Sequence, residues 1–272
     1  MPRPILVATH NVMHGRRIDA LAAHHVELRD RQGLDLLALQ EDRYLDGETE
    51  DRPSSRVAAA LGAGHQVLRD EGRPGLAFIL DTRVLACRAT GSIPLPRLAS
   101  LSWFERRYIV GGKTKQKYAL WAELQADGGA PFTAVCFHLD TAGGHHQRAA
   151  QLTALTAALV EQGLERRLVA CGDTNAFSWR RGRRRLDALL APLASLGAVD
   201  PETAPTHYFA RQREPLLPHR LGVALGRLGI DIPLRYDVVC TNLPVAARGQ
   251  VSTDGSDHDL VWAAVDATAR SW

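Results

Sequence analysis

Short apolar runs, each about as long as a strand, recur along the whole chain. They are rich in Val, Ile, Leu and Cys, and most of them end abruptly in polar residues. Runs of this length between polar residues are typical of buried strands. They cover residues 4–10, 34–40, 75–80, 117–124, 132–139, 167–173, 235–242 and 259–265. The pattern predicts a core built mainly from β-strands.

Helical spacing of apolar residues occupies some of the intervals: 16–30, 54–61, 145–161 and 183–196. Ser54 and its serine neighbour suit a helix N-cap. Pro192 is expected to interrupt the last helix, because proline removes an intrahelical hydrogen bond. Many strands with few, widely spaced helices favour two packed sheets with helices outside. A doubly wound sheet would show a stricter alternation of strand and helix.

The chain has no internal repeat and no low-complexity linker. Its 272 residues fall within the range of one large β-rich or α/β domain, so we expect a single domain over residues 1–272. The proline-containing segment 211–234 is predicted to be a long loop or an insertion of short helices. Loops of that length within a domain are often functional.

Composition narrows the class of protein. The 33 Lys and Arg against 30 Asp and Glu give a net charge of +3, which is low for a dedicated nucleic-acid-binding domain. The 4 cysteines lie in separate apolar runs without zinc-type spacing, so we expect buried, reduced thiols and a cytoplasmic protein. No apolar run approaches the roughly 20 residues that span a bilayer, and the N-terminus lacks a secretory pattern. We expect a monomer.

Carboxylates, amides and imidazoles gather at the ends of the apolar runs. They are Asn11, Glu41, His138, Asp173, Asn175, Asp237, Asp257 and His258. Each alone could be a solvated strand-end charge or a plain turn. In a layered β-rich fold, however, strand ends at one edge of the sheets can converge on one cleft. So many such groups at strand ends predict an active site.

The residue types fit one chemistry. Carboxylate and amide oxygens are ligands that Mg²⁺ or Mn²⁺ prefers. An aspartate that accepts a proton from water produces the attacking hydroxide. Amide donors and an imidazolium stabilise the charged oxygens of a phosphoryl transition state. The set therefore predicts metal-assisted hydrolysis of a phosphoester.

The order of these motifs resembles the endonuclease/exonuclease/phosphatase superfamily, the DNase I-like metal-dependent phosphohydrolases. "HN" follows the first run, and "LALQE", "FHLD", "GDTN", "RYDVV" and "SDH" come after it in that order, from residue 5 to about 265. The resemblance implies an α/β fold, a four-layer α/β/β/α sandwich of two packed mixed β-sheets flanked by helices. It also implies a phosphoric ester hydrolase that depends on Mg²⁺ or Mn²⁺.

The resemblance implies a role for each matched residue. Asn11, Glu41 and Asp257 would hold or approach the metal. His138 and Asn175 would contact the scissile phosphate.

The remaining matched residues would handle water and charge. Asp173 would orient and activate the water, and His258 would lie beside the phosphate with Asp237 orienting its ring. An acid beside a histidine fixes the tautomer and supports the charged ring. Arg148 and Gln151 match a recurrent "R-x-x-Q" and are expected to brace the site.

Substrate-binding residues are less well marked. Tyr108 is the best candidate for the tyrosine that nuclease members place beside the phosphate. The run "WRRGRRR" follows "GDTNAF", and there Arg180 and Arg181 are predicted to grip further phosphates while Trp179 stacks on a base or other group. A solvated helix start is the alternative. Lys117, with the lysines just before it, is expected to be exposed and to extend this basic rim.

We predict a phosphodiesterase rather than a monoesterase, because "GDTN" and "RYD" are closer to the tyrosyl-DNA phosphodiesterase and general phosphodiesterase branches. Two substrate classes stay open. Clustered arginines favour nucleic acid, as for a nuclease or DNA-repair phosphodiesterase, whereas the low net charge favours a small phosphorylated metabolite or lipid headgroup. A non-catalytic binding module would lack some of the catalytic set, and no HExxH or Cys/His spacing supports a zinc hydrolase.

Overall fold

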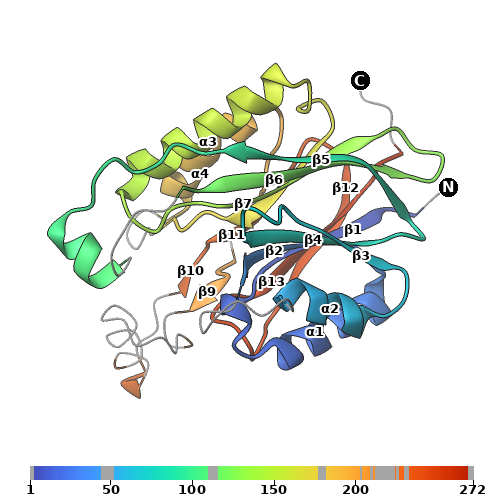
Figure 1. The fold of residues 1–272 in the computed structure, drawn as a ribbon, viewed down its shortest axis with the longest axis horizontal. Coiled ribbons are helices and arrows are strands. Elements are labelled where there is room, and N and C mark those ends of the chain that lie inside the picture. Colours follow the sequence, from blue (N-terminus) through green and yellow to red (C-terminus); the bar gives the residue numbers. More distant parts are fainter. Residues whose placement is uncertain are drawn as a thin grey trace.

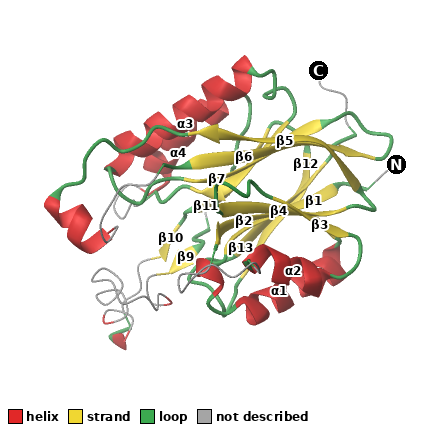
Figure 2. Ribbon diagram, in the orientation of Figure 1, coloured by secondary structure: helices red, strands yellow, loops and turns green. Residues whose placement is uncertain are grey.

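Two β-sheets face each other across the middle of the molecule, and a pair of helices covers the outer face of each (Figures 1 and 2). This arrangement comes from a computed structural model. It describes residues 3–43, 52–109, 116–176, 182–202, 204–208, 211, 224, 227–229 and 233–268.

The larger sheet has six strands in the order β12-β13-β1-β2-β4-β3. These are β12 (Val245–Val251), β13 (Leu260–Val265), β1 (Ile5–Asn11), β2 (Leu34–Asp42), β4 (Gly75–Asp81) and β3 (His65–Leu68). β1 and β2 run parallel and the other neighbours run antiparallel. The sheet is therefore mixed.

The second sheet has five strands in the order β11-β8-β7-β6-β5. These are β11 (Asp237–Thr241), β8 (Leu168–Asp173), β7 (Phe132–His138), β6 (Tyr118–Ala126) and β5 (Leu85–Pro94). Only β7 and β8 run parallel among these strands, so this sheet is mixed as well. Two short strands, β9 (His207–Tyr208) and β10 (Pro233–Leu234), pair beside the main sheets.

Alternating side chains fill three separate hydrophobic layers. On β1, Val7 packs between the two sheets, whereas Leu6 and Ala8 pack under the helices α1 (Ile18–Gln32) and α2 (Pro53–Leu61). The five-stranded sheet packs its other face against α3 (Gly144–Glu161) and α4 (Gly182–Ala194). The predicted four-layer α/β/β/α sandwich is confirmed.

Every apolar run predicted to be a strand contains one, but the sequence pattern misses the short strands β9 and β10 and, within the main sheets, β3, β5 and β12. These three strands lie at sheet edges. An edge strand has no second neighbour, and polar side chains on it remain in water. β5 shows this directly, because most of its residues are partly or fully exposed. Its apolar signal is correspondingly weak.

The four predicted helices form, with two corrections at their ends. Ser54 does not cap α2. Instead its N–H and its hydroxyl both donate to the buried carboxylate of Asp42 at the end of β2, at 2.7 and 2.8 Å. Pro192 does not interrupt α4, because it lies in the last turn and the helix continues to Ala194.

All four cysteines are free thiols, and three of them are buried. Among the described residues, no helix is both long enough and apolar enough to cross a membrane.

A matched pair of substitutions tests the packing of α2 on the larger sheet. Val57 is fully buried in α2, whereas Val160 is 50% exposed in α3. Changing either to alanine gains the same helix propensity, so a difference reports burial. Val57→Ala should lower the free energy of unfolding in urea by about 2 kcal/mol, and Val160→Ala by less than about 0.5 kcal/mol. Equal losses would contradict this packing.

Candidate active site

Polar residues from both sheets meet at one end of the layer between them. Four of them continue the two-residue period of core residues that face this layer. The period leads from Val7 to Asn11 on β1, from Cys136 to His138 on β7, from Cys171 to Asp173 on β8 and from Val239 to Asp237 on β11. The face that forms the core thus also carries the polar groups.

In the five-stranded sheet, the strand register brings the polar residues of neighbouring strands side by side. His138 lies opposite Asp173, and Asp173 lies opposite Asp237. Gly172 permits this register, because a Cβ at that position would come within 2.3 Å of the carbonyl oxygen of Phe137. The glycine of "GDTN" is therefore required by strand packing and not by a turn.

Asp173 is the centre of the cluster and is buried. Its Oδ2 accepts a hydrogen bond from Asn11 Nδ2 at 3.0 Å, and its Oδ1 accepts the N–H of Asn175 at 2.8 Å. Two imidazole nitrogens face the same carboxylate, His138 Nε2 at 3.7 Å and His258 Nε2 at 3.9 Å. Burial works to raise the pKa of Asp173, but these imidazoles and hydrogen bonds outweigh it and lower the pKa. The group is an ionised carboxylate.

His258 is held by a second buried carboxylate. Its Nδ1 lies 2.8 Å from Asp237 Oδ2, so its Nε2 is left for the cleft side. Burial alone would lower the pKa of His258, but the charges of Asp237 and Asp173 raise it well above the usual value. The ring is therefore a buried imidazolium next to Asp173.

Glu41 departs from the alternating pattern. By parity it should point away from the inter-sheet layer, but its backbone adopts φ +61°, and the β2–β4 register shifts between Gln40 and Asp42. Its carboxylate lies 3.3 Å from His14 Nε2. Burial, reinforced by the charge of Asp257, raises the pKa of Glu41 to about 7.

Positive φ angles concentrate here. Among the described residues, the non-glycine positions with positive φ are Met13, His14, Glu41 and Asn175. Such conformations cost on the order of 1–3 kcal/mol each and persist where the surroundings over-determine them. Two of the four are predicted site residues, and His14 contacts one of them.

The donor set fits a divalent cation. Two groups of described side chains have possible ligand atoms within 4.8 Å of one another: His207, Asp257 and His258 form one, and Asp173, Asp237 and His258 the other. The charge of Asp257 adds to burial in raising the pKa of Glu41, and a bound cation would relieve that repulsion. Asn11 Oδ1 accepts the N–H of Met13 at 3.0 Å and keeps a second lone pair. Oxygen ligands of this kind are those of Mg²⁺ or Mn²⁺.

Two further predicted site residues make defined contacts. Asn175 Nδ2 donates to the carbonyl oxygen of Leu139 at 2.9 Å. His138 is partly exposed, and burial together with nearby Lys117 lowers its pKa well below the usual value. A neutral imidazole therefore faces the cleft here.

Arg148 and Gln151 brace the loop after His138, as expected. Gln151 Nε2 donates to Asp140 Oδ2 at 2.8 Å, and Arg148 Nη1 donates to the backbone carbonyl of Asp140 at 3.1 Å.

The predicted substrate-binding side chains lie outside the part of the chain that the structure describes. Trp179, Arg180 and Arg181 lie outside the described residues. The backbone of Tyr108 belongs to a short helical turn, Glu105–Ile109, but its side chain also lies outside the description. All four stay predictions.

Three further residues lie near the cluster, although the sequence pattern did not place them there. Lys117 was expected to be exposed on the basic rim, but it is only partly exposed, and its ammonium group lies in the electrostatic field of Asp140, Glu41 and Asp173. Burial lowers its pKa. Its position as the first residue of an apolar run was the available signal.

The other two are His14 and His207. His14 lies within a short turn that ends at Gly15, and His207 lies in "PTHYF", which has no strand-like run of its own. Neither position carries a pattern that points to a site.

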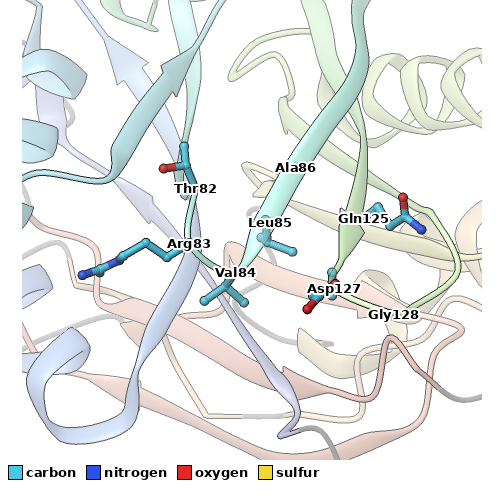
Figure 3. Close-up of a pocket in the computed structure, with 9 residues that line it drawn as sticks. Thr82, Arg83, Val84, Leu85, Ala86, Gln125, Asp127 and Gly128 are labelled. Carbon is cyan, nitrogen blue, oxygen red and sulfur yellow. The ribbon is translucent and has the colours of Figure 1, made fainter.

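A crevice far from this cluster is a separate feature. It has a volume of about 260 Å³ and is lined by residues of the β4–β5 and β6–β7 turns, including Arg83 and Asp127 (Figure 3). The β6–β7 turn adjoins Phe132, at the opposite end of β7 from His138. A seven-residue strand is roughly 20 Å long, so the crevice takes no part in the site.

Solved structures resemble this chain in fold. An endonuclease/exonuclease/phosphatase from Bacteroides vulgatus matches with a TM-score of 0.65 and 14% identity, over 98% of this chain and 100% of the other. TDP2 from D. rerio, complexed with a single-strand DNA product, matches with a TM-score of 0.64 and 13% identity, over 95% and 97%. A mannosyl-6-phosphatase from Bacteroides thetaiotaomicron matches with a TM-score of 0.60 and 14% identity, over 95% and 98%. No family model and no curated protein matches the sequence.

The chain has the endonuclease/exonuclease/phosphatase fold.

Behind the cluster of this DNase I-like fold lies a pair of buried histidines. His10 has the opposite parity to Asn11 and faces α1, where its Nδ1 lies 3.0 Å from His25 Nε2. Its Nε2 lies 3.3 Å from the carbonyl oxygen of His258. Burial lowers the pKa of His10 to about 3 and that of His25 well below its usual value. The pair is neutral and supports the loop that carries His258.

This pair predicts loss of stability in acid. In the unfolded chain both imidazoles take protons below about pH 6.5, whereas the folded protein resists protonation until about pH 3 for His10. The free energy of unfolding should therefore fall as the pH is lowered through this window. His25→Leu removes one such group. Between about pH 6.5 and 4.5, the free energy of unfolding measured in urea should fall less with decreasing pH for the variant than for wild type. The difference in slope should be up to about 1.4 kcal/mol per pH unit. Parallel curves would contradict the assignment.

Proposed function

We propose that this protein is a phosphoester hydrolase that depends on Mg²⁺ or Mn²⁺, and that it prefers phosphodiesters. One observation carries the proposal. The ionised carboxylate of Asp173 and the imidazolium of His258 lie 3.9 Å apart at the mouth of the inter-sheet layer. A base for water and a cation for phosphate are thus adjacent, which is the arrangement that in-line hydrolysis requires.

Asp173 is assigned to the water. Its carboxylate is fixed by Asn11 and by the N–H of Asn175, so a water on its open side would be oriented. Because its pKa is low, the group is a weak proton acceptor at rest. We infer that it orients the water and takes the proton only as the oxygen bonds to phosphorus.

His258, His138 and Asn175 are assigned to the phosphate. His258 donates from Nε2, and Asp237 on its Nδ1 holds the tautomer and supports the positive charge. His138 adds a neutral imidazole, and Asn175 has a second amide hydrogen beyond the one given to Leu139. Together these groups would stabilise the charge that builds on the phosphoryl oxygens.

Glu41, Asp257 and Asn11 are assigned to the metal. A bound Mg²⁺ or Mn²⁺ supplies Lewis-acid stabilisation of negative charge on the phosphoryl or leaving oxygen. These three residues would provide the oxygen ligands of the ion.

Lys117 is a further phosphate-binding candidate. The charges of Glu41, Asp173 and nearby Asp140 act on its ammonium group, and the residue is partly exposed. A lysine placed in this way is a point charge suited to a phosphate oxygen. The likeness in fold to a DNA-complexed protein and to a sugar phosphatase leaves both substrate classes open.

The free thiols support a reducing compartment, so we assign the reaction to the cytoplasm.

Replacement of Asp173 tests the reaction. We expect wild type to hydrolyse bis-p-nitrophenyl phosphate faster than p-nitrophenyl phosphate, with Mg²⁺ or Mn²⁺ and not with EDTA. Asp173→Asn keeps the shape but not the charge, so kcat should fall at least ~100-fold. Asp254→Asn, an exposed residue in the loop before His258, is the matched control and should keep full activity. Hydrolysis that survives EDTA or Asp173→Asn would overturn the mechanism.

Substitution of Lys117 tests the phosphate contact. Lys117→Met removes the charge at similar length, so kcat/KM should fall about 10- to 100-fold and the inhibition constant of inorganic phosphate should rise in parallel. Arg88→Met removes an exposed charge on β5 that pairs with Gln125 and should change neither value. A change in kcat/KM with no change in phosphate inhibition would contradict the contact.

Salt dependence separates the two substrate classes. Nucleic acid bound along a basic rim should lose affinity steeply with rising salt, whereas a small phosphoester should show a shallow dependence.

A further inference from the structure

His207 reaches the site from outside the two main sheets. Its strand, β9, is joined by backbone hydrogen bonds to the segment that carries Asp257. The N–H of Tyr208 donates to the carbonyl of Asp257 at 3.0 Å, and the N–H of Asp259 donates to the carbonyl of Thr206 at 2.7 Å. The backbone of His207 also forms an isolated antiparallel β-bridge with that of His258. The backbone therefore fixes His207 beside the candidate metal ligand.

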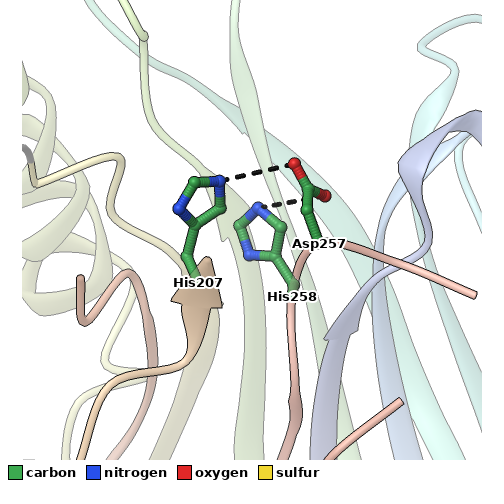
Figure 4. A group of neighbouring side chains, drawn as sticks. All are labelled: His207, Asp257 and His258. Atoms are coloured by element: carbon green, nitrogen blue, oxygen red, sulfur yellow. Dashed lines mark ion pairs between the residues drawn. The ribbon is translucent and has the colours of Figure 1, made fainter. Parts of the chain in front are cut away.

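The ring of His207 is fixed as firmly as its backbone. It is 1% exposed, stacks on Tyr236 with ring centroids 4.5 Å apart, and meets the edge of His258 at 4.7 Å. In this position its Nε2 lies 3.4 Å from Asp257 Oδ2 (Figure 4). Packing against these two rings holds the imidazole in a position where it faces the carboxylate.

The two oxygens of Asp257 consequently have different surroundings. Oδ2 faces His207, whereas Oδ1 lies 3.4 Å from Ser256 Oγ and 3.9 Å from His258 Nε2. Burial works to raise the pKa of Asp257, but the His207 contact and the charge of His258 lower it. The carboxylate stays ionised with Oδ1 on the site side.

We infer that His207 is a positioning residue, which donates to Asp257 Oδ2 and thereby directs Oδ1 of this carboxylate toward the divalent cation. The inference rests on the proposed function, in which Asp257 is a metal ligand. Carboxylates that bind metals are themselves hydrogen-bonded by outer residues, and loss of such a partner typically weakens metal affinity 10- to 100-fold.

The geometry favours this role over direct ligation by His207. One nitrogen already faces Oδ2, and the ring packs against both Tyr236 and His258. A direct imidazole ligand would also shift the preference toward ions such as Zn²⁺. That alternative is an outcome of the experiment.

Two substitutions at this one position provide the test. His207→Phe keeps a ring to stack on Tyr236 but removes the donor, whereas His207→Gln keeps an amide donor. Titration calorimetry with Mn²⁺ should show His207→Phe binding about 10- to 100-fold more weakly than wild type. His207→Gln should remain within a few-fold of wild type, and far-UV circular dichroism should show the same fold for all three.

An Asp257→Asn background supplies the control, because coupling of the two residues makes their effects non-additive. In that background His207→Phe should cost no further Mn²⁺ affinity. If it costs the same factor as in wild type, the inference is overturned. Equal Mn²⁺ binding by all three proteins overturns it too, and leaves the proposed function intact. Preferred binding of Zn²⁺ by wild type, lost in both variants, replaces positioning with direct ligation. No Mn²⁺ or Mg²⁺ binding by wild type overturns the metal assignment and this inference together.

Discussion

The candidate site depends on one steric constraint, the alternation of side chains along the strands of two sheets that share a single apolar layer. Because the period is two residues, every strand that contributes a Val, Leu or Cys to this layer must direct its later residues of the same parity toward the same layer. Asn11, His138 and Asp173 occupy such positions at the ends of β1, β7 and β8. The packing that stabilises the sandwich therefore also positions the polar groups.

Concentrating carboxylates at the end of an apolar layer has an electrostatic cost. Unpaired buried charges are strongly unfavourable, so each acid needs a partner. Imidazoles serve as those partners, with Asp237 and Asp173 facing His258, and Asp257 facing His207. Glu41 faces His14 Nε2 at 3.3 Å, yet burial, together with the charge of Asp257, still raises its pKa to about 7. A cation is the group that this charge pattern would accept most readily.

The backbone departs from regular strand geometry where the alternation of side chains alone would not bring a residue to the site. Glu41 reaches the site because its φ is +61° and β2 shifts register there. Asn175 likewise has a φ of +46°, which lets its N–H turn back to Asp173. His207 comes from a strand outside both main sheets. Parts of the site are thus held by strained backbone and by an added strand, which suits positions selected for chemistry more than for stability.

The sequence by itself determined the central strands, the four helices, the layered class and the motif residues at strand ends. Their signals are local, since buried strands form apolar runs and polar residues interrupt them sharply. The sequence pattern missed edge strands such as β5. Many residues of β5 remain in water, so its apolar pattern is weak. Only the tertiary structure decided the roles of Lys117 and His207, and the capping of α2 by Asp42. In each case the decisive neighbour is distant in the chain, and its proximity follows from sheet register and layer packing, which no single segment encodes.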